Sequence, residues 1–276
     1  MATPRLSVVV PCYNDGPLLL EALDSIAEPE PVEVIVVDDC STESETLEIL
    51  ERLPEGVRLE CHTVNKGLAI ARNTGLSVVT TPYVFPLDSD DLAYPGALSK
   101  MADRLDAKPD MAVCYGDYLE FGDLDLIREV PRRLDTFRLL YTNEYPVSAL
   151  FRCSVLKQLG GWHLGAGYED WDLWLTLVER GCEGIHLGSG APSYRRRIHG
   201  NRMLSVAKRK HVALYTTLKN DHRTVFAGVA VHRRESDMPA LRKFLYPIVY
   251  GRRRRFAFER HLKRLLDRAG VWTLRR

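Results

Sequence analysis

Residues 6–39, LSVVVPCYNDGPLLLEALDSIAEPEPVEVIVVDD, hold the pattern that decides the fold. Residues 6–10 and 32–37 are short, nearly continuous apolar runs rich in β-branched side chains, which is typical of strands buried on both faces of a parallel sheet. Between them, Pro17 precedes apolar residues that recur about every 3.6 positions, so this stretch is predicted to be a helix. Strand, helix and strand in this order predict a crossover unit with two parallel strands.

The same alternation of helices and strands continues to residue 116. We expect further helices near residues 43–53, 68–78 and 95–105, and further strands near residues 57–63, 83–87 and 111–115. Right-handed crossovers place helices on both faces of the sheet, so the sequence predicts an α/β, Rossmann-like, three-layer fold with a mostly parallel central sheet. In this organisation residues 1–116 form a doubly wound half that binds a nucleotide.

The pattern loosens after residue 117, but residues 117–205 are expected to complete the same domain as its second half. They contain a strongly amphipathic helix at 169–180, which Gly181 ends. Residues 206–276 have helical tendency and form a predicted basic C-terminal extension. Residues 241–276 carry 12 Lys and Arg side chains against two acids, whereas the first 240 residues carry 26 basic and 35 acidic side chains. This segregation of charge predicts an anionic partner for the extension.

The extension has two alternative interpretations. Residues 241–276 interleave aromatic and aliphatic side chains with arginines, as do helices that lie on an anionic membrane surface. The simpler alternative is a helix docked on the rest of the chain. A nucleic-acid partner is not expected, because the sequence contains no recognition motif of that kind.

The cysteines and the apolar segments bear on where the protein works. None of the six cysteines forms a C-x-x-C pair or a ligand-like cluster, so neither a zinc site nor a disulfide framework is indicated, and a reducing compartment suits them. The N-terminus leads directly into the first strand, so no signal peptide is expected, and no apolar stretch is long enough for a membrane span. We therefore expect a cytoplasmic protein, at most peripheral on the inner face of the membrane.

Polar residues follow three of the predicted strands, at the edge of the sheet where ligands of open α/β folds bind. They occupy residues 11–15 (PCYND), 38–41 (DDCS) and 88–91 (DSDD). Asp88 and Asp90, two positions apart on a segment expected to be extended, would point to the same side and hold Mg²⁺ or Mn²⁺ together with oxygens of a diphosphate. The alternative is that Asp88 and Asp91 only turn the chain and cap the next helix.

Four segments occur together in order: VVVPCYNDGPLLLEALDSI (8–26), VIVVDDCSTE (34–43), NKGLAIARNTGL (65–76) and YVFPLDSDD (83–91). As a set they resemble the family 2 inverting glycosyltransferases of the GT-A fold, closely over residues 6–95 and loosely over residues 145–205. The resemblance implies a metal-dependent enzyme of polysaccharide biosynthesis. It would move a sugar from a nucleotide-diphosphate donor, expected to be a UDP-sugar, to a hydroxyl of a saccharide or lipid-linked acceptor, with Mn²⁺ or Mg²⁺ as cofactor.

The resemblance also assigns roles to residues of the first half. The residues expected at the nucleotide base are Pro11, Tyr13, Asp15 and Asp39, of which Asp39 would accept a hydrogen bond from a uracil-like N3–H. The residues expected at the rest of the donor are Lys66, Gly67, Arg72, Asp88 and Ser89. The metal ligands would be Asp88, Asp90 and His199. The alternative for Arg72 is a helical cation that faces solvent.

Two acids open the amphipathic helix of the second half. The resemblance assigns Asp170 as the catalytic base that deprotonates the acceptor hydroxyl, and Glu169 as its neighbour in the catalytic pair, positioning the acceptor or a metal-bound water. The alternative is that both acids only meet the dipole of the helix N-terminus.

Two aromatic groups and one basic segment complete the set of candidates. Trp162 is a candidate for stacking on a sugar ring, whereas Trp171 and Trp174 lie three positions apart on one helix face and are expected in the core. Residues 194–199, YRRRIH, depart from the family's Y-R-x-H segment by extra arginines, and the histidine of that segment would be His199.

Two rival functions fit the sequence less well. Nucleotidyl transfer on a similar fold needs a glycine-rich phosphate loop after the first strand, but residues 11–16 contain one glycine. A catalytically silent scaffold that binds a nucleotide sugar would not need Asp88, Asp90 and Asp170 intact.

Overall fold

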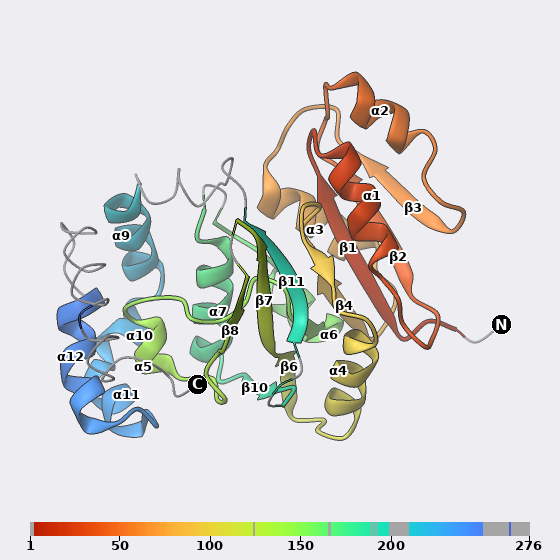
Figure 1. Cartoon of the computed structure of the whole chain (residues 1–276). Helices are drawn as coiled ribbons and strands as arrows, with labels where there is room; N and C mark the ends of the chain where they lie inside the picture. The colour runs from red at the N-terminus through yellow and green to blue at the C-terminus, as the bar shows by residue number, and fades with distance from the viewer. Residues whose placement is uncertain are drawn as a thin grey trace.

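The computed structural model describes residues 3–123, 125–164, 167–188, 190, 192–198, 210–250 and 265. Its centre is a seven-stranded sheet in the order β10-β6-β9-β4-β1-β2-β3 (Figure 1). The strands are β1 (Leu6–Cys12), β2 (Glu33–Asp38), β3 (Val57–Cys61), β4 (Tyr83–Pro86), β6 (Met111–Tyr115), β9 (Leu150–Arg152) and β10 (Glu183–His186). β1 runs parallel to β2 and β4, β2 to β3, and β6 to β10, so the predicted mostly parallel sheet is confirmed.

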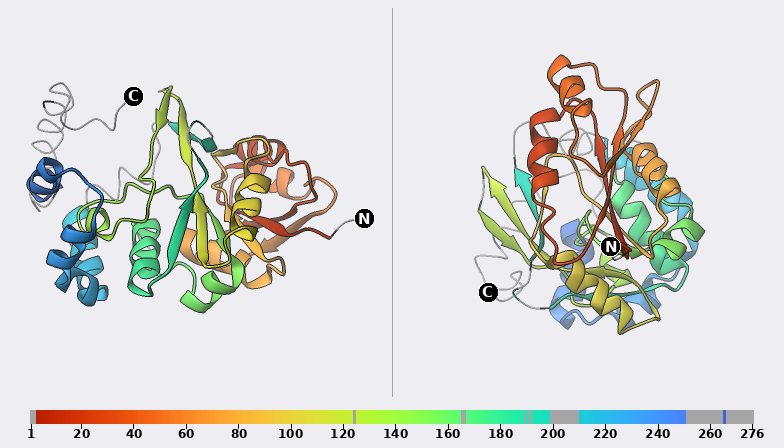
Figure 2. Two further views of the ribbon diagram at one scale, coloured as in Figure 1. Left: turned by 90° about the horizontal axis from the view of Figure 1, so that it is seen from below. Right: turned by 90° about the vertical axis from the view of Figure 1, so that its right-hand side faces the viewer.

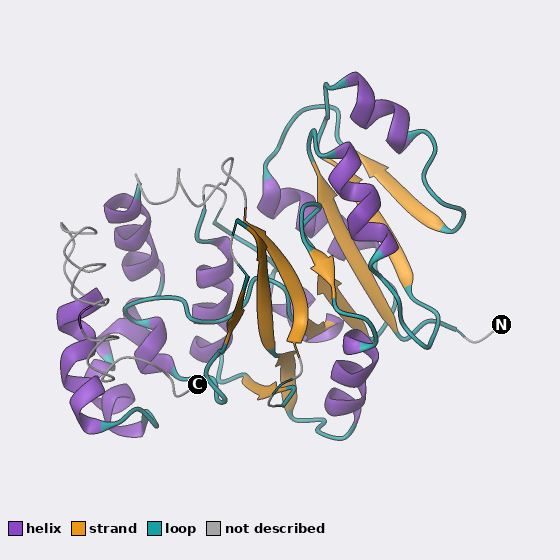
Figure 3. Ribbon diagram, in the orientation of Figure 1, coloured by secondary structure: helices purple, strands orange, loops and turns teal. Residues whose placement is uncertain are grey.

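Helices cover both faces of this sheet (Figure 3). One core cluster contains Val8 and Val10 of β1, together with buried residues of α1 (Gly16–Asp24), α2 (Ser44–Leu50) and α4 (Ala97–Asp106). The other contains Val9, together with buried residues of α3 (Leu68–Val78), α6 (Cys153–Leu159) and α7 (Glu169–Glu179). Successive side chains of a strand point to opposite faces, so the continuous apolar run of β1 supplies both cores and gives the predicted three layers.

A four-stranded sheet in the order β5-β11-β7-β8 continues from the carboxyl ends of the central strands. Its strands are β5 (Leu92–Ala93), β7 (Asp117–Gly122), β8 (Leu126–Arg128) and β11 (Pro192–Ile198). β11 runs antiparallel to β5 and parallel to β7. Because β5 follows residues 88–91 directly, this second sheet fixes the acidic segment from one side.

The predicted elements of residues 6–115 are found within a few residues of their expected positions. The sequence did not indicate β9, which lies antiparallel between β4 and β6. The central sheet therefore draws strands from both predicted halves. The proposed boundary at residue 116 falls between β6 and β7 and stays a prediction.

Within residues 210–250 the structure describes four helices: α9 (His211–Asp221), α10 (Arg223–Ala227), α11 (Val229–Glu235) and α12 (Ala240–Tyr250). They pack around α5 (Thr136–Leu139) and α7, at the opposite end of the molecule from β3 (Figures 1 and 2). Residues 251–264 and 266–276, the most basic part of the extension, lie outside the described residues. Among the described residues, no helix is long and apolar enough to cross a membrane.

Candidate active site

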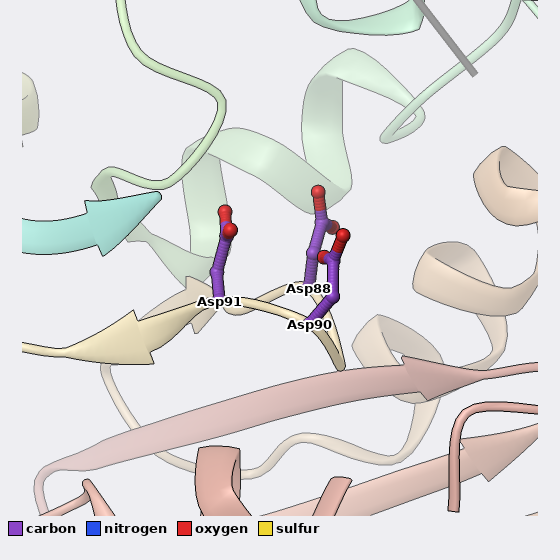
Figure 4. A group of neighbouring side chains, drawn as sticks. All are labelled: Asp88, Asp90 and Asp91. Atoms are coloured by element: carbon purple, nitrogen blue, oxygen red, sulfur yellow. The ribbon is translucent and has the colours of Figure 1, made fainter. Parts of the chain in front are cut away.

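The acidic segment after β4 is a turn, not the extended strand end that the sequence predicted. The backbone N–H of Asp91 donates to the carbonyl of Asp88 over 3.0 Å, which closes a turn between β4 and β5. The carboxylates still gather: one oxygen from each of Asp88, Asp90 and Asp91 lies within 4.8 Å of the others. Figure 4 shows all three side chains pointing to the same side of the segment. Turn and ligand cluster are therefore compatible, although they were considered as alternatives.

Asp91 also belongs to this cluster, whereas the sequence suggested for it only a role in turning the chain and capping the next helix. It is buried, and burial together with Asp90 and Asp88 raises the pKa of its carboxyl well above the usual range. It accepts a hydrogen bond from the Arg197 backbone N–H over 2.8 Å, while Arg197 Nε donates to the carbonyl of Asp90 over 3.0 Å. The sequence did contain a signal for Asp91, because it is the third acid of residues 88–91, DSDD.

The donor set fits a divalent cation. Three clustered carboxylates, two of them half-buried and one buried, repel one another, and Mg²⁺ or Mn²⁺ is the kind of ion that oxygen ligands of this type hold. Asp88, Asp90 and Asp91 are the described residues that would supply these ligands. His199, the third ligand predicted beside Asp88 and Asp90, lies outside the described residues.

Arg72 is a buried cation between the two acidic groups of the site. Its side chain is 0% exposed; Nη2 lies 2.5 Å from Asp88 Oδ1 and Nη1 lies 3.2 Å from Glu169 Oε1. Helix α3 can carry Arg72 this close to the sheet because Gly75 packs on β1, where an added Cβ would lie 2.3 Å from Val9 Cγ1. The alternative of a solvent-facing cation is wrong. A direct nucleotide contact stays a prediction, and in this arrangement Arg72 links Asp88 to Glu169.

Asp39 holds the loop that leads into α3. Its carboxylate lies 2.7 Å from His62 Nδ1 and accepts hydrogen bonds from the backbone N–H groups of Lys66 (2.8 Å) and Gly67 (2.7 Å). A carboxylate offers about four acceptor positions, so three neighbours leave room for one more donor. The predicted bond to a uracil-like N3–H is compatible with this geometry. His62 had no signal in the sequence.

The loop after β1 presents an exposed aromatic ring, and the Cys12 carbonyl just before it accepts a hydrogen bond from the Asp39 backbone N–H over 2.8 Å. Tyr13 is 46% exposed, while Pro11 is buried within β1. Asn14 adopts a positive φ of 59°, and its Oδ1 accepts hydrogen bonds from the Thr42 and Glu43 backbone N–H groups just before α2. A non-glycine residue at positive φ costs free energy, and such residues cluster at functional sites.

The end of β4 is tied to the end of β1. Ser89 Oγ donates to Asp15 Oδ2 over 3.0 Å, so two predicted donor-binding residues contact each other. Lys66 is exposed on the approach to α3. The carboxyl ends of β1, β2 and β4 therefore meet as expected, and the predicted donor residues border one edge of the sheet.

Glu169 and Asp170 stand at the start of α7. Arg72 lies between this acidic pair and the acidic turn, because it contacts both Glu169 and Asp88. Burial raises the pKa of Glu169 to about 7, although Arg72 acts in the opposite direction. Burial also raises the pKa of Asp170, which accepts a hydrogen bond from Asn143 Nδ2 over 2.8 Å. Tyr168, the residue before them, has a positive φ of 68°. Burial thus outweighs the stabilisation of these acids by the helix dipole, which is the electrostatic state expected of a base.

All three predicted tryptophans are buried, but they have different neighbours. Trp171 and Trp174 are buried as predicted, and their Nε1–H groups donate to the carbonyls of Leu139 and Pro146. Trp162 is only 3% exposed and lies beside the Arg72 guanidinium, 5.8 Å from ring centroid to Cζ. Its expected role as an open platform for a sugar is therefore not supported, because its ring is covered.

The arginines of β11 contact side chains of the second sheet and of α1. Arg195 lies over the ring of Phe121, and Arg196 lies over Tyr118 and pairs with Glu120. Arg197 Nη2 lies 2.5 Å from Glu21 Oε2. These contacts align β11 along the acidic turn.

Comparisons with known proteins relate the chain to a family model, to curated relatives and to solved structures. Residues 7–160 match the family model described as Glycosyl transferase family 2. Over 198 residues the chain is 30% identical to the UDP-Gal:alpha-D-GlcNAc-diphosphoundecaprenol beta-1,3-galactosyltransferase of Escherichia coli, which covers 67% of this chain and 72% of that protein. It is 36% identical over 137 residues to the succinoglycan biosynthesis protein ExoO of Rhizobium meliloti (strain 1021), which covers 49% of this chain and 37% of that protein.

The chain also spans 20% of the length of a third relative, the uncharacterized protein y4gI of Sinorhizobium fredii, with 32% identity over 193 residues and 64% of this chain covered. Among solved structures, S. aureus TarS 1-349 in complex with UDP-GlcNAc superposes with a TM-score of 0.62 at 23% identity, covering 97% of this chain and 78% of that chain. The mannosyltransferase PcManGT from Pyrobaculum calidifontis, in complex with GDP-Man and Mn²⁺, has a TM-score of 0.58 at 21% identity, covering 96% of this chain and 88% of that chain. Both likenesses support the predicted fold.

Proposed function

Because the chain belongs to glycosyl transferase family 2, we propose that it moves a sugar from a UDP-sugar to a hydroxyl of a saccharide or lipid-linked acceptor, with inversion and with Mn²⁺ or Mg²⁺. That the protein is a glycosyltransferase follows from its family and its relatives. The observation that carries the finer proposal is the pairing of two acidic groups, Asp88–Asp90–Asp91 and Glu169–Asp170, around the buried Arg72.

Each group has a task that its geometry suits. Tyr13 stacks on the base, and the remaining acceptor position of Asp39 binds the N3–H. When bound at the acidic turn, the metal would neutralise charge on the departing diphosphate. Asp170 takes the proton from the acceptor hydroxyl as its oxygen attacks the anomeric carbon from the side opposite the diphosphate, and a single displacement of this kind inverts the configuration.

A thermal-shift screen tests donor and metal together. UDP, UDP-N-acetylglucosamine, UDP-galactose and GDP-mannose are each added with Mn²⁺, with Mg²⁺ and with a chelator. We expect a metal-dependent rise in Tm with UDP and at least one UDP-sugar, since a ligand at about 100 times its Kd adds roughly 2.7 kcal/mol to the native state. Asp90→Ala should abolish this rise, whereas the exposed Asp110→Ala, its matched control, should keep it. A full response in Asp90→Ala would contradict the metal site.

Removal of the base gives a second prediction. Asp170→Asn keeps the size and shape of the side chain and should lower the transfer rate by about 10²–10⁴-fold, with the Tm response to UDP and Mn²⁺ unchanged. Transfer at near the original rate would show that another residue is the base. Loss of both transfer and donor binding would point to a structural role for Asp170 instead.

We also propose that the protein is cytoplasmic and that residues 241–276 make a peripheral contact with the anionic inner face of the membrane. Both interpretations of the extension find support in α12: Tyr246 and Val249 are buried against the domain, while Leu241 and Phe244 are 57% and 58% exposed. Replacing Leu241 and Phe244 by Glu should reduce co-sedimentation with vesicles that contain phosphatidylglycerol. Ile127→Glu, an equally exposed apolar position on β8, is the control. Equal sedimentation of all variants would exclude α12 as the contact.

A further inference from the structure

Asn143, in the loop between α5 and β9, meets the side chain of Asp170. Asn143 Nδ2 donates to Asp170 Oδ2 over 2.8 Å, and Asn143 Oδ1 accepts from the backbone N–H of Tyr145 over 2.9 Å. A backbone N–H can only donate, so the amide oxygen must face Tyr145 and the amide NH₂ must face Asp170. The contact is thus a donor pointed at the carboxylate, with its orientation fixed by the main chain.

The loop that carries Asn143 is held in place on both sides. The Tyr145 hydroxyl accepts from the Asp135 backbone N–H (2.6 Å) and donates to the Arg133 carbonyl (2.7 Å). Ser236, in the loop before α12, donates to Asp135 Oδ2 over 2.6 Å. The C-terminal helices therefore help to fix this loop.

The residue next to Asn143 is anchored as well. Glu144 lies 2.7 Å from Nη1 of Arg138, which is buried on α5, and 3.6 Å from Nη2 of Arg242 on α12. Separating the mostly buried Arg138 and Glu144 would leave a charge without its partner, so the loop has little freedom to move away from α7. Asn143 can then act as a fixed partner.

We propose that Asn143 is a positioning residue that fixes the rotamer of the Asp170 carboxylate and favours its ionised form. The inference rests on the proposed role of Asp170 as base. Holding one carboxylate oxygen determines where the other one points, and so aims it at the acceptor hydroxyl. In the transfer step the proton passes from that hydroxyl to Asp170, the hydroxyl oxygen bonds to the anomeric carbon, and the bond to the UDP oxygen breaks with its electron pair. Asn143 exchanges no proton.

The groups around Asp170 define what the loss of Asn143 would do. Burial raises the pKa of Asp170, and the Trp171 backbone N–H, the Arg72 charge and the Asn143 amide lower it. Glu169 on the same helix and Tyr118 on β7 also interact electrostatically with Asp170. Asn143 is the one of these groups that is neutral, lies outside α7 and donates a side-chain hydrogen bond to Asp170.

The test compares Asn143→Ala and the near-isosteric Asn143→Asp with Asn220→Asp, a matched control on the exposed end of α9. The titration of Asp170 is followed by NMR in protein labelled with ¹³C at the aspartate carboxyl carbons, where Asp170→Asn identifies the signal. We expect the midpoint to move to higher pH in Asn143→Ala, and further in Asn143→Asp because a second carboxylate then faces Asp170. This measurement needs no ligand. Unchanged midpoints in both variants would overturn the inference.

Kinetics separates this inference from the proposed function. The assay measures UDP release from UDP-N-acetylglucosamine and UDP-galactose with Mn²⁺ and with water as acceptor. In Asn143→Ala we expect kcat to fall about 10- to 100-fold, with KM for the donor unchanged. The acidic limb of the pH–rate profile should move to higher pH. If Asp170→Asn lowers kcat but neither Asn143 variant does, the positioning role alone is wrong. If Asp170→Asn releases UDP at the original rate, the base assignment and the inference fail together. Asn143→Asp retains the acceptor for Tyr145, so it decides the question if the alanine variant fails to fold.

Discussion

Arg72 is the buried positive charge that the two acidic groups of the site share. Arg72→Ala should lower the free energy of unfolding by about 3 kcal/mol, because Asp88 and Glu169 lose their common partner. The same substitution should also abolish UDP release, because Asp88 and Glu169 then repel each other with no positive charge between them. Denaturant unfolding and the UDP-release assay measure these effects. Arg58→Ala, which removes an exposed pair with Glu60, should change stability by no more than about 0.5 kcal/mol. An equal, small loss in both variants would mean that Arg72 is not a structural link.

At the scale of elements, His222 joins the C-terminal helices to α7. Its ring nitrogens lie 3.0 Å from Asp172 Oδ1 and 2.8 Å from Glu179 Oε2. Burial lowers the pKa of His222, but the two carboxylates outweigh burial and raise it above its ordinary value of 6.5. A raised folded-state pKa contributes stability that is complete below the unfolded-state pKa and is lost as pH rises through the folded-state value.

His222→Gln should therefore cost about 2 kcal/mol at pH 6 and less at pH 9, which flattens the decline of stability with pH. Thermal unfolding across this range measures it, with His232→Gln, 4.0 Å from the exposed Glu235, as the control. A parallel pH profile for wild type and His222→Gln would contradict the assignment.

The same scale shows which elements a sequence can predict. β1 and β2 carry their own apolar runs and α3 its own helical pattern, so the ends of all three were predicted to within two residues. β9 is three residues long and exists because β4 and β6 flank it, and a pattern so short is not distinguishable from a loop. The turn at residues 88–91 was wrongly predicted as extended. Its shape depends on contacts with β5 and β11, which the local sequence does not reveal. Asn143 had no local signal, since its partner Asp170 is 27 positions away.

At the scale of the whole molecule, the position of β9 makes the two halves of the chain interdependent. A fragment of residues 1–116 leaves β4 and β6 without the strand that joins them. We expect this fragment to unfold without a cooperative transition and to aggregate through its open strand edges, whereas the full chain should unfold cooperatively. Calorimetry of both proteins measures this. A sharp transition in the fragment would show that residues 1–116 fold independently.

The contact between Arg72 and Asp88 has a consequence for the order in which ligands arrive and leave. A lone divalent ion approaching the acidic turn meets a guanidinium already seated on Asp88 Oδ1, so its affinity for the empty enzyme should be low. A nucleotide diphosphate brings negative charge of its own and removes that disadvantage. The ion and the nucleotide should therefore bind as one complex and dissociate as one complex. A chelator should then inactivate the free enzyme rapidly, but should inactivate it only slowly once UDP is bound.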